Sequence, residues 1–89
     1  MDAVKIPIAD VLDLHTFLPG EIHDLLNDYF SECIKKKIYS VRIIHGKGKG
    51  ILRDQVLSLL NKNPKVVSFQ QAPLEAGGWG ATLVELKKY

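Results

Sequence analysis

Apolar residues in the first part of the chain change their spacing near residue 19, and this change separates a strand from a helix. From Leu12 to His15 apolar and polar residues alternate, which predicts a short strand over 11–15. Pro19 occupies the favoured first position of a helix. The helix should end at the lysines of 35–37, because cations favour the carbonyl end of a helix dipole. One apolar face is expected along it: Ile22, Leu25, Leu26, Tyr29, Phe30, Cys33 and Ile34.

The rest of the chain predicts a strand, a second helix and two more strands. Asn63-Pro64 should end the second helix, because proline disfavours helical geometry in the residue before it. Its inward face is expected at Leu52, Val56, Leu59 and Leu60. The predicted ranges are a strand over 40–44, a helix over about 49–62, strands over 66–70 and 80–86, and a loop over 71–79.

The expected element order is β-α-β-α-β-β, which defines an α/β fold with a mixed four-stranded sheet and two helices. Strands joined through helices should run parallel with right-handed crossovers, and the last two strands can pair as a hairpin. At 89 residues the chain has room for one domain, expected over 11–89 after an N-terminal extension of 1–10.

Composition narrows the class of protein. No apolar stretch approaches the roughly 20 residues needed to cross a membrane, and the N-terminus lacks the pattern of a secretory signal. A cytoplasmic location and no membrane partner are therefore expected, with a monomer as the default. Cys33 is the single cysteine, so it cannot form an internal disulfide, and its helix position predicts a buried thiol.

Charge divides unevenly along the chain. Residues 1–40 hold four lysines against seven acidic residues, hence −3, whereas residues 41–89 hold eight basic residues against three acidic ones, hence +5. The basic half favours a polyanionic partner. The alternative is an accidental scatter of surface charge.

The basic half contains a glycine-lysine run that has the character of a phosphate cradle. Glycines let the backbone approach a ligand, and lysines with the start of a helix supply positive potential. Arg53 lies in the first turn of the second helix, where a cation is unfavourable unless an anion is near, and Trp79 can stack on an unpaired base. The alternatives are a loop that simply leads into the helix and a Trp79 that covers the end of the core. The run is His45-Gly46-Lys47-Gly48-Lys49-Gly50.

The predicted topology brings this run next to a second polar motif. Asp13 and His15 lie at the end of the first predicted strand, and His45 lies at the end of the second. Parallel strands joined by one crossover carry their carboxyl ends to the same edge of a sheet, where ligands gather in open α/β folds. Asp13, His15, His45 and Lys47 are therefore expected to converge. The alternatives are that Asp13 caps a turn, that His15 bonds to backbone, and that His45 only fixes the turn into the helix.

The combination of these motifs resembles the small MutS-related (Smr) domain family. The resemblance covers about residues 11–86 and rests on Leu12-Asp13-Leu14-His15, on the run over 45–50, and on the glycine-rich segment over 77–82. It implies a compact two-layer α/β sandwich similar to the C-terminal domain of translation initiation factor 3, in a stand-alone protein that binds or cleaves nucleic acid. Members of the family include DNA-nicking and RNA-cleaving endonucleases and members without demonstrated cleavage. Those that cleave depend on the aspartate and histidine that match Asp13 and His15. The family often has glycine after this motif, whereas this chain has Thr16-Phe17.

A chemical hypothesis for phosphodiester cleavage follows from these residues. His15 and His45 share acid–base work and Asp13 orients an imidazole. Cleavage of RNA through its 2′-hydroxyl needs no metal, whereas for DNA a divalent ion on Asp13, His15 and His45 can activate water. The phosphate is held by Lys47 and by the amides of Gly46, Gly48 and Lys49, with Gly50, Arg53 and Trp79 as further nucleic-acid contacts. A non-catalytic RNA- or DNA-binding module and a protein-interaction domain remain the alternatives.

Overall fold

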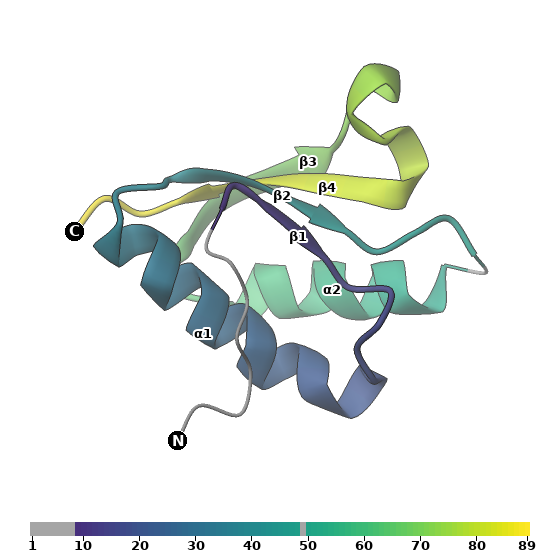
Figure 1. Cartoon of the computed structure of the whole chain (residues 1–89), viewed down its shortest axis with the longest axis horizontal. Coiled ribbons are helices and arrows are strands. Elements are labelled where there is room, and N and C mark those ends of the chain that lie inside the picture. The colour runs from purple at the N-terminus through teal and green to yellow at the C-terminus, as the bar shows by residue number, and fades with distance from the viewer. Residues whose placement is uncertain (1–8, 49) are drawn as a thin grey trace.

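The computed structural model describes residues 9–48 and 50–89 and contains four strands and two helices in the predicted order (Figure 1). The expectations that fall on residues 1–8, most of the N-terminal extension, and on Lys49 lie outside the described residues. Within these ranges no helix is long and apolar enough to cross a membrane, and the cytoplasmic location stays a prediction. The elements are β1 (Val11–Asp13), α1 (Ile22–Lys35), β2 (Ser40–Ile44), α2 (Ile51–Lys62), β3 (Val66–Gln71) and β4 (Ala81–Leu86).

The four strands form one mixed sheet in the order β1-β2-β4-β3. β1 pairs with β2 in parallel, and β4 pairs antiparallel with both β2 and β3. β2 and β3, which α2 connects, therefore run in the same direction but are separated by β4. The predicted α/β fold and the pairing of the last two strands are confirmed.

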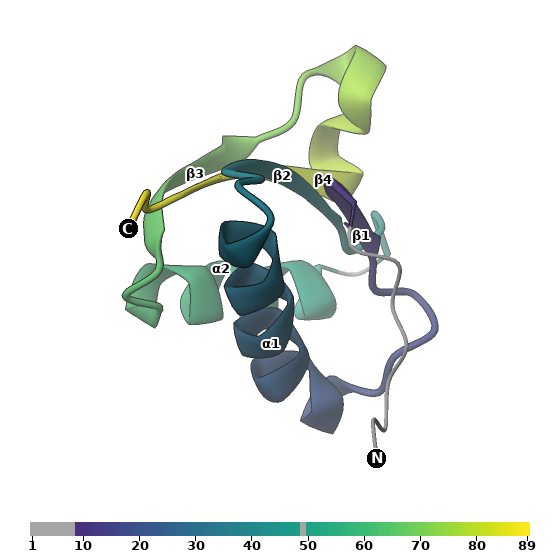
Figure 2. The same ribbon diagram turned by 60° about the vertical axis from the view of Figure 1, so that its left-hand side comes forward.

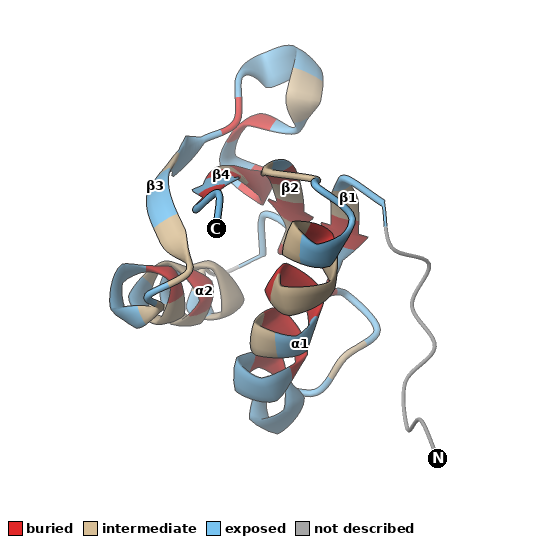
Figure 3. Cartoon of the chain, turned by 90° about the vertical axis from the view of Figure 1, so that its left-hand side faces the viewer, coloured by how far each residue is buried: buried red, intermediate tan, exposed pale blue. Residues whose placement is uncertain are grey.

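The molecule has two layers, with both helices on one face of the sheet (Figures 1 and 2). The buried side of each helix faces the sheet (Figure 3), as the spacing of its apolar residues predicts. The connection between β3 and β4 rises on the opposite side of the sheet (Figure 1). Fully buried side chains between the layers include Leu14, Ile22, Phe30, Cys33, Ile43, Val56, Leu60 and Val84.

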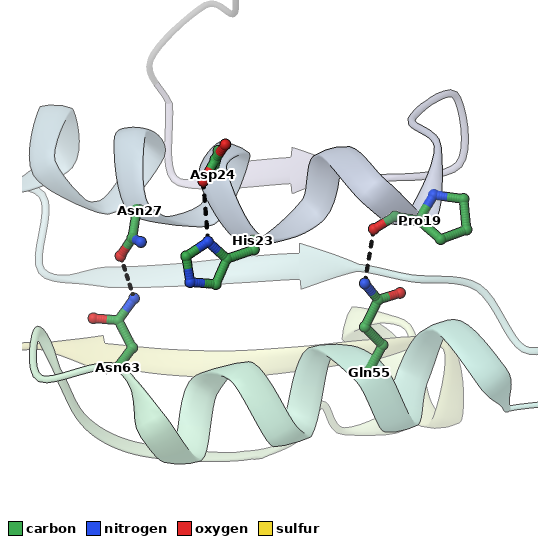
Figure 4. A network of polar contacts seen from close by, with 6 residues as sticks. All are labelled: Pro19, His23, Asp24, Asn27, Gln55 and Asn63. Atoms are coloured by element: carbon green, nitrogen blue, oxygen red, sulfur yellow. Dashed lines mark hydrogen bonds and ion pairs between the residues drawn. The ribbon is translucent and has the colours of Figure 1, made fainter.

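The polar contacts between the helices fix how the two elements lie against each other (Figure 4). Gln55 Nε2 donates to the Pro19 carbonyl over 2.8 Å near the start of both helices. Asn63 Nδ2 donates to Asn27 Oδ1 over 3.0 Å at the end of α2. These contacts hold α2, and with it the loop that precedes it, against the rest of the domain.

The differences from the predicted boundaries have local causes. β1 ends at Asp13 because the chain then turns, and α1 is preceded by a 3-10 turn over Pro19–Glu21. β4 begins at Ala81, one residue later than predicted. The segment predicted as a loop over 71–79 is more ordered than expected: β3 reaches Gln71, and 3-10 turns occupy Leu74–Ala76 and Gly78–Gly80.

Candidate functional site

The carboxyl ends of β1 and β2 lie side by side at one edge of the sheet. Asp13 is paired with Ile44 in the parallel register, and the Leu14 amide donates to the Ile44 carbonyl over 2.8 Å. His15 lies two residues after the end of β1 and His45 directly follows β2, so both leave the sheet at the same edge. The edge at which the sequence predicts convergence is formed by this register.

Asp13 and His15 form a hydrogen-bonded pair in the turn after β1. The Asp13 carboxylate accepts from the His15 backbone amide over 3.0 Å and from His15 Nδ1 over 2.7 Å. These two hydrogen bonds, the backbone one first, hold the pKa of Asp13 below its usual range, so its carboxylate is ionised at neutral pH. Both side chains remain accessible, with 72% of the His15 side chain and 47% of the Asp13 side chain exposed.

The geometry of this pair leaves one ring nitrogen of His15 for chemistry. A carboxylate can only accept, so His15 Nδ1 carries a proton and Nε2 is the basic nitrogen of the neutral ring. Asp13 thus selects the tautomer in which Nε2 is free to accept a proton. The carboxylate also fixes the turn, so the turn-capping alternative and the orienting role coexist in one side chain.

His45 lies in a different environment, because its ring is buried with only 5% of the residue exposed. Nδ1 lies 3.1 Å from the Gly46 carbonyl and Nε2 lies 2.9 Å from the Thr82 hydroxyl. A carbonyl only accepts, so Nδ1 donates and Nε2 accepts from Thr82. Burial lowers the pKa of His45, the bond to the Gly46 carbonyl partly opposes this, and the charge of Arg53 adds to the lowering. The ring is therefore neutral at pH 7 and both nitrogens are occupied.

The glycine-lysine run over 45–50, from here on called the glycine-lysine loop, forms a hollow with the first turn of α2. Gly46, Gly48 and Gly50 all have positive φ angles, and Gly50 at +83° is the residue from which α2 starts. That angle is costly for any residue with a side chain, which is why glycine serves there. The hollow has a volume of about 270 Å³ and is lined by His45, Gly46, Lys47, Gly48, Gly50, Ile51, Leu52 and Arg53.

Only part of the loop backbone is available to a ligand. The amides of His45 and Gly46 both donate to the Gly80 carbonyl, over 3.0 and 2.9 Å. The Gly46 amide, expected to hold a phosphate, therefore binds the Gly80 carbonyl in the turn before β4 instead. Two described cations lie next to the hollow: Lys47, whose side chain is exposed, and Arg53.

Trp79 and Arg53 stack on each other beside this loop. The Arg53 guanidinium carbon lies 3.9 Å from the Trp79 ring centroid, and the indole Nε1 donates to the Lys47 carbonyl over 3.2 Å. Trp79 therefore packs on the glycine-lysine loop, and 45% of it remains exposed. It does not belong to the buried core cluster. Its stacking on a nucleic-acid base stays a prediction.

Among the described residues, Asp13, His15 and His45 do not form the metal site that was considered for them from the sequence. Across residues 9–48 and 50–89 no three histidine, cysteine, aspartate or glutamate side chains are grouped to hold an ion. Asp13 and His15 bind each other, and both nitrogens of His45 are engaged. These three side chains therefore do not present a common set of ligands.

Three residues at this edge had no individual role assigned from the sequence, although Gly80 and Thr82 belong to the glycine-rich segment over 77–82. The Thr82 hydroxyl donates to His45 Nε2, and the polar side chain at a buried position of an alternating strand was the available signal. Gly80 lies close under Lys47: a Cβ there would lie 3.3 Å from Lys47 Cγ, so a side chain at this position would require Lys47 to shift by a few tenths of an ångström. Arg42 donates from Nη1 to the Ala76 carbonyl over 3.1 Å, which ties the connection between β3 and β4 to the sheet.

The residues that depart from the family motif have separate roles. Phe17 packs against the core and its amide donates to the Leu14 carbonyl over 3.0 Å, closing the turn after β1. Thr16 is exposed beside His15. The turn therefore folds without the glycine, and Thr16 adds an exposed side chain next to His15.

The fold and the site together define a class of protein, namely small two-layer α/β domains that place an Asp–His pair and a glycine-rich loop at the carboxyl edge of a mixed sheet. The family model of the Smr domain matches residues 12–87. The chain belongs to the Smr domain family. The Smr domain of Thermus thermophilus MutS2 superposes with a TM-score of 0.82 at 30% identity, covering 89% of this chain and 99% of that one. YdaL, a stand-alone small MutS-related protein from Escherichia coli, superposes with a TM-score of 0.82 at 28% identity, covering 94% of this chain and 69% of that one.

The curated relatives are longer proteins. Ribosome rescue factor SmrB of Aliivibrio fischeri is 41% identical over 80 residues, covering 89% of this chain and 45% of that protein. Endonuclease MutS2 of Helicobacter pylori is 41% identical over 75 residues, covering 84% of this chain and 10% of that protein. The chain thus spans about half the length of the first of these relatives and a tenth of the second.

Proposed function

We propose that this domain binds nucleic acid at the carboxyl edge of β1 and β2 and cleaves its phosphodiester backbone. The observation that carries the proposal is the Asp13–His15 pair, an ionised carboxylate bonded to an exposed imidazole. It lies at the strand edge from which the glycine-lysine loop departs. The names of two relatives, ribosome rescue factor and endonuclease, support a role in nucleic-acid metabolism.

In this mechanism His15 is the general base. Its Nε2 takes the proton from the attacking hydroxyl, which is the ribose 2′-hydroxyl in RNA or water in DNA, and Asp13 stabilises the resulting imidazolium. Lys47 and Arg53 offset the charge that develops on the phosphate oxygens. Because His45 is buried with both nitrogens engaged, the proton for the leaving oxygen comes from solvent.

His45 is a positioning residue in this proposal. Its bond to the Gly46 carbonyl and the bonds of the 45–46 amides to Gly80 set the direction in which the loop leaves β2. This replaces the acid–base role expected from the sequence with a structural one. The proposal therefore requires that His45 affect binding and stability, and that His15 affect the chemical step.

The decisive experiment incubates labelled RNA and DNA, each single-stranded and duplex, with the wild-type chain and with His15→Ala, with and without EDTA. Cleavage by the wild type alone, unchanged in EDTA, supports the proposed mechanism. Equal cleavage by both proteins would show that another site or a contaminant is responsible. Binding without cleavage would support a non-catalytic module, and binding of neither nucleic acid would favour the protein-interaction alternative.

A further inference from the structure

The end of the molecule opposite the candidate site carries most of the basic charge in the described chain. The end of α1, the start of β3 and the C-terminus gather on the left of Figure 1, whereas residues 45–48 and the start of α2 are on the right. We call this region the basic end. Its lysines come from three separate stretches of sequence: Lys35, Lys36 and Lys37 at the end of α1, Lys62 and Lys65 around the end of α2, and Lys87 and Lys88 after β4.

Backbone hydrogen bonds hold these stretches together. The Lys87 amide donates to the Lys65 carbonyl over 2.9 Å, and the Leu86 amide donates to the Tyr39 carbonyl over 2.7 Å. The ammonium of Lys88 lies 5.5 Å from the centroid of the Tyr39 ring. The lysines therefore share one end of the domain because of the fold, although they are dispersed through both halves of the sequence.

Helix dipoles and ion pairs account for a minority of this charge. Lys35 and Lys62 lie in the last turns of α1 and α2, where cations are favourable. The acidic residues at this end of the described chain are Asp10, Glu32 and Glu85. Glu32 pairs with Lys35 over 3.1 Å, and Glu85 accepts from the Ser40 hydroxyl over 2.8 Å. An excess of positive charge remains.

The backbone conformation of Lys37 is a second, independent observation on the basic end. A charged residue occupies a position whose backbone conformation favours glycine. The Lys37 amide donates to the Ile34 carbonyl and the Ile38 amide to the Cys33 carbonyl, which is a Schellman ending for α1. In that motif the position of Lys37 adopts a left-handed backbone, here with φ of 60°, and strongly favours glycine. A lysine in a conformation that costs free energy points to a use for its ammonium group.

We propose that the basic end binds the phosphate backbone of the same nucleic acid, away from the point of cleavage. The inference rests on the proposed function, because that function supplies the polyanion. The longest extent of the domain is 33 Å, which about 10 base pairs span at about 3.4 Å each. A nucleic acid engaged at the candidate site can therefore reach the basic end, whereas an anionic membrane or an acidic protein has no reason to touch both ends.

The test uses the 89-residue chain and two labelled ligands, a duplex of about 24 base pairs and a hairpin whose stem of about 17 Å is too short to span the domain. In the test variant Lys36, Lys37, Lys87 and Lys88 are all changed to Gln. We expect its affinity for the long duplex to fall at least about 10-fold and its affinity for the hairpin to be unchanged. The slope of log affinity against log salt for the duplex should decrease by about 0.9 for each phosphate that the variant no longer neutralises.

Matched controls separate local contacts from net charge. Arginine at the same four positions should retain the wild-type affinity and salt slope. Adding Asp24→Asn and Asp28→Asn to the Gln variant restores part of the net charge elsewhere on α1, and recovery of duplex affinity in that protein would overturn the proposal. An equal decrease for both ligands, or weaker binding to phosphatidylserine vesicles with duplex binding intact, would also overturn it.

Lys37→Gly is the sharpest single variant, because the backbone and the charge of Lys37 predict opposite effects. Glycine relieves the left-handed backbone, so thermal stability should rise while duplex affinity falls. If stability rises with unchanged affinity, the charge of Lys37 has no role in binding and the proposal fails at this residue.

Length-dependent binding without any cleavage would support the basic end while overturning the proposed nuclease activity. Cleavage and binding that do not depend on the lysines of the basic end would support the proposed nuclease activity while overturning the role of the basic end.

Discussion

His15 and His45 follow neighbouring strands at the same sheet edge, yet their imidazole rings lie in opposite environments. His15 is 72% exposed in its side chain and bonded to an ionised carboxylate. His45 is 5% exposed and bonded to a carbonyl and a hydroxyl, with burial lowering its pKa. The first arrangement leaves a basic nitrogen for a substrate, and the second uses both nitrogens to hold the fold. In the proposed function, two motifs of similar appearance therefore have different roles, one in the chemistry and the other in positioning.

The largest expected effect is the loss of cleavage in His15→Ala. Removing a general base costs about 100- to 10,000-fold in rate, measured as kcat on whichever nucleic acid the wild type cleaves. Because the side chain is mostly exposed, the free energy of unfolding should change by no more than about 0.5 kcal/mol. His23→Ala, an exposed histidine on α1 that pairs with Asp24, is the matched control and should keep full activity. A strongly destabilised His15→Ala protein would contradict the division of roles.

His45→Ala should produce the converse result. Its imidazole fills a buried position and leaves the Thr82 hydroxyl without a partner when removed, so unfolding should become easier by about 2–3 kcal/mol. Chemical denaturation measures this directly. At a temperature where the variant stays folded, its affinity for nucleic acid should fall because the loop is less well directed, while residual turnover of bound substrate persists. A stable variant that binds normally and has lost all turnover would restore His45 to the chemistry.

Thr82→Val should have a smaller effect of the same kind. Valine preserves the shape of the side chain but removes the donor to His45 Nε2, and a buried acceptor without a partner costs about 1–2 kcal/mol. Nitrogen chemical shifts of the His45 ring report its tautomer. Thr82→Ser keeps the hydroxyl and should keep the wild-type shifts. Identical shifts in Thr82→Val and the wild type would show that the hydroxyl does not bind Nε2.

The sequence predicted the fold and the meeting of strand ends, because both follow from local spacing and from how parallel strands are joined. It did not predict the burial of His45, which depends on Thr82 and Gly80 from β4 and the turn before it, far along the chain. The division of charge between the two halves of the sequence also did not predict where the charged residues lie in the folded domain. Lys87 belongs to the basic half and Lys37 to the acidic one, yet the fold collects both at the end away from the candidate site.

The smallest expected effect is a pH dependence of stability that belongs to His45. Its pKa in the folded chain is lowered by burial, so as pH falls below about 6.5 the unfolded chain binds a proton that the folded chain does not. Stability from this residue is therefore fully present at neutral pH and is lost as pH falls through that value toward the lower pKa of the folded state. Denaturation midpoints measured between about pH 5 and 8 should fall with acid more steeply in the wild type than in His45→Gln. Parallel curves would mean that the buried ring accepts a proton without cost, and the environments of the two histidines would then differ less than their contacts indicate.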